Sequence, residues 1–258
     1  MASASSPRFV MGALAALGLL AGCGRTVAEP VTLADLKDRT LQFVLTDVDS
    51  LERDSSVGAY RFTLKFSEGS SCARLTEGVT ASFNGQPMKL SLGGVPDTGA
   101  GGRDVCEVPS ATFDFDPSQW NDEPTEDIRV ILQDDTHSVL LVLQDAKAKR
   151  RFLRSGGTAG TLRRGQTHTY VWLPETDTVQ EGTVQASLVH EASATVADLD
   201  VKQEGNAALL TVPAGTVEAR YVLRLSGTAA PRVLTCEGVA GCAGALFHSE
   251  DVEVSVTN

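Results

Sequence analysis

The sequence predicts an all-β protein built from two β-sandwich domains. Runs of alternating apolar and polar residues recur along the chain, as in residues 60–66 (YRFTLKF), and such alternation is typical of half-buried strands. Turn-forming Gly, Asn, Asp and Pro residues separate the runs, which is the pattern of a sandwich. A Gly-rich break at residues 155–160 (SGGTAG) suggests two units, 31–155 and 156–258.

The N-terminal residues have the composition of an export signal. Residues 1–8 carry one positive side chain and no acid, and residues 9–20 (FVMGALAALGLL) form an uncharged apolar run. A helix of this length is too short for the roughly 30 Å of bilayer hydrocarbon, which needs about 20 residues. The run therefore predicts the apolar core of a signal peptide.

A cysteine follows this run directly, in Leu20-Ala21-Gly22-Cys23. The stretch resembles the lipobox of bacterial lipoproteins. That resemblance implies cleavage after Gly22, attachment of diacylglycerol to the Cys23 sulfur and acylation of the new amino group. Residues 1–22 are then the signal peptide and residues 23–30 a lipidated tether, at most about 25 Å long when extended. An ordinary secretory signal that contains a cysteine is the alternative.

The resemblance also implies a location. Gly24, rather than an aspartate, follows Cys23, as in lipoproteins that are exported onward to the outer membrane. We therefore expect a lipid-anchored protein of the bacterial cell envelope, at the outer membrane and facing either the periplasm or the cell surface. Two or three acyl chains make a durable anchor, whereas one chain alone binds membranes only marginally.

The charge of the mature chain disfavours nucleic acid as a partner. The sequence has 22 basic and 33 acidic residues, and removal of the signal peptide takes away one arginine, which leaves 21 against 33 and a net charge of −12. Nucleic-acid binding needs a positive surface. No run after the signal is long and apolar enough to span a membrane, so the Cys23 lipid is the expected membrane attachment.

Four cysteines remain after Cys23, and disulfides are expected in an exported chain. Four cysteines allow three pairings. We favour Cys72 with Cys106 and Cys236 with Cys242, because each pair then lies within one domain. A zinc site is the weaker alternative, since the spacing of Cys236 and Cys242 is not typical of zinc ligands and no histidine lies beside either pair.

The first domain is expected to contain seven strands after a single helical turn that Thr32 and Asp35 can cap. The strands are 41–46, 60–66, 79–83, 88–92, 111–115, 128–133 and 139–144. Asn84-Gly85 tolerates positive φ and predicts a hairpin between the third and fourth strands. The Gly-rich segment 93–102 lacks the lysine of a phosphate-binding loop and is expected to be a flexible connection.

The second domain has the length of an immunoglobulin-type sandwich and resembles a fibronectin type III domain in two short motifs. Residues 170–174 (YVWLP) place a proline two positions after a tryptophan, and residues 210–216 (LTVPAGT) precede a strand that contains Tyr221. The resemblance implies that Trp172 is the core tryptophan and that Tyr221 is the corner tyrosine, with its hydroxyl bonded back to the backbone. A different sandwich with a chance Trp-x-Pro sequence is the alternative.

The sequence contains no recognisable catalytic motif, so we expect a protein that is not an enzyme and that has no cofactor or metal. Motifs of serine hydrolases, zinc proteases and P-loop proteins are absent, and the four histidines have no ligand spacing. His168 shares the alternation of Tyr170 and Trp172, and we interpret it as a strand residue. The Asp-x-Asp pairs at 47–49, 114–116 and 198–200 are interpreted as solvated turns rather than calcium ligands.

Two segments are candidate binding surfaces. One is basic and contains no acid, and its residues are Lys147, Lys149, Arg150, Arg151, Arg154, Arg163 and Arg164. It predicts either a patch for acidic glycan or anionic lipid headgroups, or a solvated face whose charges pair with the acids of residues 114–127. Residues 227–247 are expected to form a loop at one end of the second sandwich, with Glu237 and Val239 on a tip closed by the Cys236–Cys242 bridge.

Together these features predict a lipid-anchored lipoprotein that acts as a non-catalytic binding or scaffolding module for a protein or glycan partner. The alternatives are an envelope hydrolase that uses paired carboxylates and a structural accessory subunit of an outer-membrane complex. A deep cleft lined by two or more close carboxylates would favour the hydrolase, whereas flat sheets would favour binding.

Overall fold

The computed structural model describes residues 28–51, 59–95, 105–123, 126–157 and 160–258. The predicted signal peptide and the predicted lipidation site at Cys23 lie outside these residues. The described chain consists of strands and two short 3-10 helices, η1 (Ala34–Leu36) and η2 (Pro117–Gln119). None of the helices in these residues is long and apolar enough to cross a membrane. The all-β prediction is confirmed.

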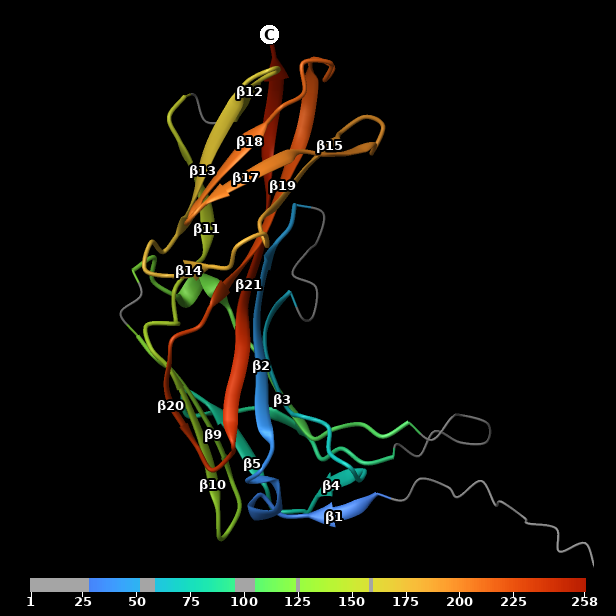
Figure 1. The fold of residues 1–258 in the computed structure, drawn as a ribbon, viewed down its shortest axis with the longest axis vertical. Coiled ribbons are helices and arrows are strands. Elements are labelled where there is room, and N and C mark those ends of the chain that lie inside the picture. The colour runs from blue at the N-terminus through green and yellow to red at the C-terminus, as the bar shows by residue number, and fades with distance from the viewer. Residues whose placement is uncertain (1–27, 52–58, 96–104, 124–125, 158–159) are drawn as a thin grey trace, which may run out of the picture.

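One sheet of ten strands runs along the elongated molecule (Figure 1). Its order is β16 (Val196–Asp198), β15 (Gln185–His190), β19 (Ala219–Ala230), β21 (Gly241–Thr257), β2 (Thr40–Asp49), β3 (Tyr60–Phe66), β8 (Ser110–Asp114) and β7 (Lys89–Ser91). Two further strands join it, β12 (Thr161–Arg163) on β21 and β14 (Thr178–Val179) on β19. The first part of β21 pairs with β2 and its later part with β19.

Two smaller sheets cover the ten-stranded sheet and complete two sandwiches. The five-stranded sheet has the order β20 (Val233–Glu237), β10 (Ser138–Leu143), β9 (Ile128–Gln133), β5 (Thr80–Phe83) and β6 (Gln86–Pro87). It forms the first sandwich with β2 and β3, and the Phe62 and Phe83 rings meet between the sheets with centroids 5.3 Å apart. A separate pair joins β1 (Glu29–Val31) to β4 (Ala73–Leu75).

The four-stranded sheet forms the second sandwich with β19 and the later part of β21. Its order is β11 (Arg151–Ser155), β13 (Thr167–Leu173), β18 (Ala207–Thr211) and β17 (Asp200–Glu204). The Trp172 ring of this sheet lies edge-on to His248 of β21, with ring centroids 5.7 Å apart. The two sandwiches therefore share one continuous sheet, and β21 belongs to both.

Local sequence patterns predicted the strands well. The runs 60–66, 128–133 and 167–173 coincide with β3, β9 and β13. Asn84 and Gly85 have positive φ angles of 46° and 80°, as the hairpin prediction requires. The hairpin is shorter than expected, because β6 ends at Pro87 and β7 then pairs with β8 in the ten-stranded sheet.

Strand pairing crosses the Gly-rich segment that suggested a domain boundary. β11, which ends at Ser155, pairs with β13 of the second sandwich. β20, from the C-terminal part of the chain, pairs with β10 of the first sandwich. Each sandwich therefore takes strands from both sides of residues 155–160.

The prediction of a loop over residues 227–247 is wrong. β19, β20 and β21 cover most of this segment. The turn closed by Cys236 and Cys242 lies against the first sandwich, where the Ala240 N–H donates a hydrogen bond to Arg39 O at 3.0 Å. Its small and polar residues suggested a loop, but pairing with β10 and β2 satisfies the backbone polar groups of this segment.

The core of the second sandwich has the two features that the fibronectin resemblance implied. Trp172 is completely buried and lies edge-on to Phe152 at a centroid distance of 5.3 Å. The Tyr221 hydroxyl donates a hydrogen bond to Val217 O at 3.0 Å. Gly227 allows close packing beside the tryptophan, because a Cβ there would lie 3.0 Å from the Trp172 ring.

A buried charged cluster, formed by Asp47, His248 and Glu250, lies where the two sandwiches meet. His248 is 1% exposed, with Nδ1 3.3 Å from Asp47 Oδ2 and Nε2 3.2 Å from Glu250 Oε2. Glu250 also accepts a hydrogen bond from the Phe152 N–H at 3.0 Å. The interpretation of residues 47–49 as a solvated turn is wrong, since β2 continues through both aspartates and buries Asp47 between the sheets.

The disulfides join Cys72 to Cys106 and Cys236 to Cys242, with sequence separations of 34 and 6. The longer loop restricts the unfolded chain more. We expect Cys72→Ala with Cys106→Ala to lower the free energy of unfolding by about 4 kcal/mol, and Cys236→Ala with Cys242→Ala by about 2 kcal/mol. Urea unfolding of the oxidised protein measures both losses, and equal losses would contradict the chain-entropy argument.

Candidate functional site

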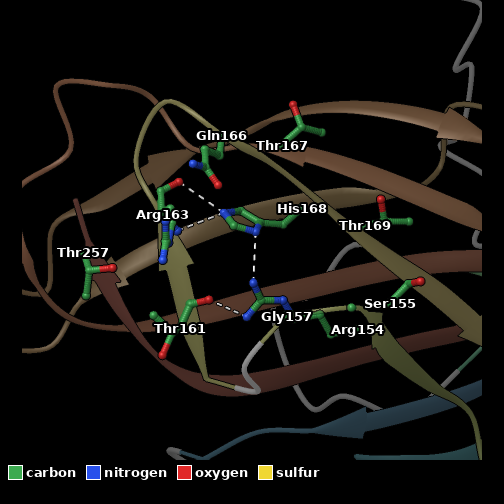
Figure 2. Close-up of a pocket in the computed structure, with 11 residues that line it drawn as sticks. Arg154, Ser155, Gly157, Thr161, Arg163, Gln166, Thr167, His168, Thr169 and Thr257 are labelled. Carbon is green, nitrogen blue, oxygen red and sulfur yellow. Dashed lines mark hydrogen bonds between the residues drawn. The ribbon is translucent and has the colours of Figure 1, made fainter.

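A pocket of about 470 Å³ lies in the second sandwich (Figure 2). It is at the end of the molecule that carries the C-terminus, labelled C in Figure 1. We call it the distal pocket. Its lining includes Arg154 of β11, Thr161 and Arg163 of β12, His168 of β13 and Thr257 of β21. A volume of this size lies in the range of small-ligand sites.

Strand pairing sets the position of this pocket. β11 and β13 are antiparallel, with Arg154 opposite Tyr170. β12 lies between these two strands in sequence but belongs to the ten-stranded sheet. It pairs in parallel with the end of β21, so that Arg163 lies opposite Thr257. The pocket therefore forms where the four-stranded sheet and the ten-stranded sheet separate at the end of the sandwich.

Arg154 and His168 hold each other in the wall of the pocket (Figure 2). The Arg154 Nη2 lies 3.0 Å from His168 Nδ1, and its Nη1 donates to the Thr161 carbonyl. A guanidinium has no acceptor, so His168 Nδ1 must accept this hydrogen bond. His168 Nε2 lies 3.1 Å from the Arg163 carbonyl and 3.0 Å from the Arg163 backbone N–H.

Burial and the neighbouring Arg154 charge lower the pKa of His168, against an opposing backbone hydrogen bond to Arg163. The lowered pKa favours the neutral form of the ring at neutral pH. His168 positions Arg154 and adds no charge of its own.

The distal pocket is cationic in an acidic protein. Arg154 and Arg163 line it, and no carboxylate is among its described lining residues, whereas the whole chain has a net charge of −11. Arg163 is exposed. Hydroxyl and amide groups complete the lining, from Ser155, Thr161, Gln166, Thr167, Thr169 and Thr257. Guanidinium groups pair with carboxylates, phosphates and sulfates, so the pocket suits an anionic ligand rich in hydroxyls.

The other five basic candidates lie outside the distal pocket. Arg150 is buried, and its Nε donates to Asp177 Oδ2 at 2.9 Å. Lys147 and Arg151 form ion pairs with Glu126 and Asp122 of the acidic segment. The remaining two basic residues also lie near acids. Arg164 forms an ion pair with Glu218, and Lys149 lines a separate pocket together with Asp122 and Glu123. The seven basic residues therefore do not form one continuous patch.

Glu237 and Val239 lie far from this pocket, on the turn against the first sandwich. Glu237 is exposed, whereas Val239 is partly buried and packs against the core. Val239→Asp is therefore expected to disturb folding as well as any contact. Among the described residues, no group of three or more His, Cys, Asp or Glu side chains could hold a metal ion.

Sequence reasoning identified Arg154 and Arg163 but not the pocket that they share. The sequence contained part of the information needed to find this pocket. The alternation of residues 167–173 places His168 on the same face of the strand as the buried Tyr170 and Trp172. The approach of β12 to the end of β21 joins residues about 90 positions apart, and no local pattern predicts it.

No protein-family model and no curated protein matches this chain. Among solved structures, a Bacteroides vulgatus protein named as a bacterial DNA-binding protein is 17% identical over 40% of this chain and 42% of its own, with a TM-score of 0.27. A Bacteroides ovatus protein of a mixed-linkage glucan utilisation locus, solved with a heptasaccharide, is 11% identical over 83% of this chain and 43% of its own, with a TM-score of 0.23. The titin domains Z1Z2, solved with telethonin, are 10% identical over 91% of this chain and 96% of their own, with a TM-score of 0.22.

This chain spans less than half the length of the first two of these structures. Likenesses at these TM-scores carry no argument about function.

Proposed function

We propose that the protein is a lipid-anchored, non-catalytic binding module of the bacterial cell envelope, and that its distal pocket binds an acidic glycan. The observation that supports this most strongly is the pair of arginines in a pocket without a described carboxylate. A carboxylated or sulfated sugar supplies the anionic group that guanidinium recognises in a fork-like geometry. Its hydroxyls match the threonine and glutamine side chains around the arginines.

The position of the pocket favours a ligand away from the anchoring membrane. β1, the first described strand, lies at the opposite end of the molecule from β12 and the C-terminus (Figure 1). A tether of residues 23–30 spans at most about 25 Å, so it keeps the first sandwich close to the bilayer. The pocket then faces outward, which favours an envelope or extracellular glycan over the headgroups of the same membrane.

The shared sheet makes the protein a stiff spacer between anchor and pocket. β21 has 17 residues, and at about 3.3 Å per residue it is about 56 Å long. Its pairing with β2, β19 and β12 leaves no flexible linker between the sandwiches along this strand. The pocket is thus held at a fixed height above the first sandwich.

Binding should depend on the two arginines and on the charge of the sugar. With hexagalacturonate as the probe, we expect Arg163→Gln to weaken binding about 10-fold or more, and Arg154→Gln with Arg163→Gln to abolish it, because a hydrogen bond to a charged group contributes about 1.5–3 kcal/mol. Isothermal titration calorimetry measures the affinities. Arg129→Gln, at an exposed position of the first sandwich, is the matched control and should bind normally.

Two other results would contradict this function. Methyl-esterified hexagalacturonate has the same rings without the charge, so equal binding of the ester would exclude recognition through the arginines. Binding of the lipid-free protein to phosphatidylglycerol vesicles, but not to hexagalacturonate, would assign the pocket to lipid headgroups.

The anchor is tested separately. Cys23→Ser removes the sulfur that carries the diacylglycerol, so we expect complete loss of acylation and release of the protein from the membrane fraction. Metabolic labelling with a fatty acid and fractionation of cells measure both effects. Cys236→Ser with Cys242→Ser is the control for loss of cysteine, and a Cys23→Ser protein that is still acylated would exclude the lipoprotein assignment.

A further inference from the structure

A second pocket of about 470 Å³ lies in the first sandwich, at the open edge between the five-stranded and ten-stranded sheets. We call it the edge pocket. Phe83 and Gln86 reach it from the β5–β6 hairpin, and Phe113 and Asp114 from β8. Trp120, just after η2, also lines it. This pocket shares no lining residue with the distal pocket.

Aromatic rings form the apolar part of the edge pocket. The Phe83 and Phe113 rings stack with centroids 4.6 Å apart and an interplanar angle of 12°, and the Phe115 and Trp120 rings stack at 4.2 Å and 12°. Phe113 is only partly buried. Trp120 is 6% exposed, and no described residue accepts a hydrogen bond from its indole N–H. The rings are therefore held rigidly, and an indole donor is left for a ligand.

Three carboxylates belong to the polar lining of the edge pocket, and each is held in position. The Arg61 guanidinium donates to both oxygens of Asp114, at 2.6 and 3.0 Å. Asp116 caps η2 through the Ser118 N–H at 2.9 Å. Glu126 forms an ion pair with Lys147 at 2.5 Å. A carboxylate has about four acceptor sites, so each of these groups can accept further hydrogen bonds from a ligand without changing its position.

The edge pocket is suited to binding rather than to hydrolysis. Glycoside hydrolysis needs one carboxylic acid with a raised pKa to protonate the leaving group. Hydrogen bonds from Arg61 and from Ser118 instead lower the pKa of Asp114 and of Asp116, and Glu126 is paired with a lysine. Asp114 and Asp116 therefore act as acceptors and do not supply a proton.

We propose that the edge pocket binds a neutral saccharide. A sugar ring combines an apolar face with hydroxyl donors, and the pocket offers aromatic surface beside fixed carboxylate acceptors. Three carboxylates against two cations, Arg61 and Lys147, leave a net negative charge that disfavours an acidic sugar, so this site selects against the ligand class proposed for the distal pocket. The proposal does not rest on the function of the distal pocket.

The test uses the mature, acylated protein in detergent and three neutral glucose hexaoses, namely cellohexaose, maltohexaose and laminarihexaose. We expect at least one to bind in calorimetry and to change the fluorescence of Trp120, since Trp172 is completely buried in the other sandwich. Asp114→Asn and Glu126→Gln should each weaken binding about 10-fold, because each removes a carboxylate acceptor while preserving the size and shape of the side chain. Asp122→Asn, at an exposed carboxylate of the same segment outside this pocket, is the matched control and should bind normally.

The alternative results would overturn the proposal. Failure of all three hexaoses to bind would exclude a neutral glucan site of this kind, and full binding by the Asp114→Asn, Glu126→Gln double variant would place the ligand elsewhere. Equal binding of hexagalacturonate by the Arg154→Gln, Arg163→Gln variant would exclude selection against acidic sugars here. Release of reducing ends during the titration would show hydrolysis instead of binding.

Discussion

Raising the pH from 6 to 10 is expected to lower the free energy of unfolding by about 3 kcal/mol, because His248 loses its proton between Asp47 and Glu250. Burial by itself lowers the pKa of this imidazole, but the two carboxylates outweigh it and raise the pKa from 6.5 to about 9. The folded protein therefore holds this proton more tightly than the unfolded chain.

The direction of the effect follows from that difference. Below pH 6.5 both states are protonated and the full stabilisation is present. As the pH rises toward 9, the unfolded chain releases its proton first and the advantage of the folded state decreases. Above pH 9 both states are neutral and this contribution is lost, and two buried carboxylates then face an uncharged ring.

The measurement is guanidinium unfolding at a series of pH values, with direct titration of the His248 ring by NMR. His248→Gln is the matched control, because its side chain is polar and does not titrate. The variant should be less stable than the wild type at pH 6, and the two curves should converge by pH 10. Parallel curves for the two proteins would contradict a proton held by this cluster.

Replacing Trp172 by alanine is expected to lower the free energy of unfolding by about 3–5 kcal/mol. The ring is completely buried and lies edge-on to Phe152 and His248. Its Nε1 donates to Asp177 at 3.1 Å, the carboxylate that also pairs with the buried Arg150. The alanine variant therefore creates a cavity and removes one donor from a buried ion pair.

Circular dichroism during guanidinium unfolding measures this loss without relying on the deleted fluorophore. Trp172→Phe fills more of the cavity and keeps a ring between Phe152 and His248, so it should lose clearly less stability than the alanine variant. A loss below about 1.5 kcal/mol for Trp172→Ala would mean that the second sandwich can repack around the site.

Local patterns in the sequence predict the strands but not the way in which they form two sandwiches. Alternation identified β3 and β13, and it placed His168 and Trp172 on one face. The pairing of Thr40 with Gly241 joins positions that are 201 residues apart. The first five residues of β21, 241–245 (GCAGA), have small side chains and show no alternation of apolar and polar residues. The sequence of neither strand therefore indicates its partner, and residues 227–247, which include the start of β21, were interpreted as a loop.

The residues of the candidate site could likewise be predicted from the sequence, but their arrangement could not. The charge of Arg154 and Arg163 is visible in the sequence, and so is the acidic segment that neutralises Lys147 and Arg151. Which basic residues form ion pairs depends on which acids the folded chain brings near. The edge pocket was missed for a similar reason, because Phe83, Phe113 and Trp120 come from separate elements and only the sandwich brings them together.

The parallel pairing of β2 and β21 has a mechanical consequence. β2 starts at the end of the molecule nearest β1, and β21 runs beside it in the same direction toward the distal pocket (Figure 1). A pull on a captured polymer, resisted at the N-terminal tether, would draw these neighbours past each other along their length. Such a force loads the hydrogen bonds of the whole register from Thr40–Gly241 to Asp49–Glu250 together, rather than opening them one at a time from an end. The strand order that joins the sandwiches thus also suits the protein to resist a force along its length.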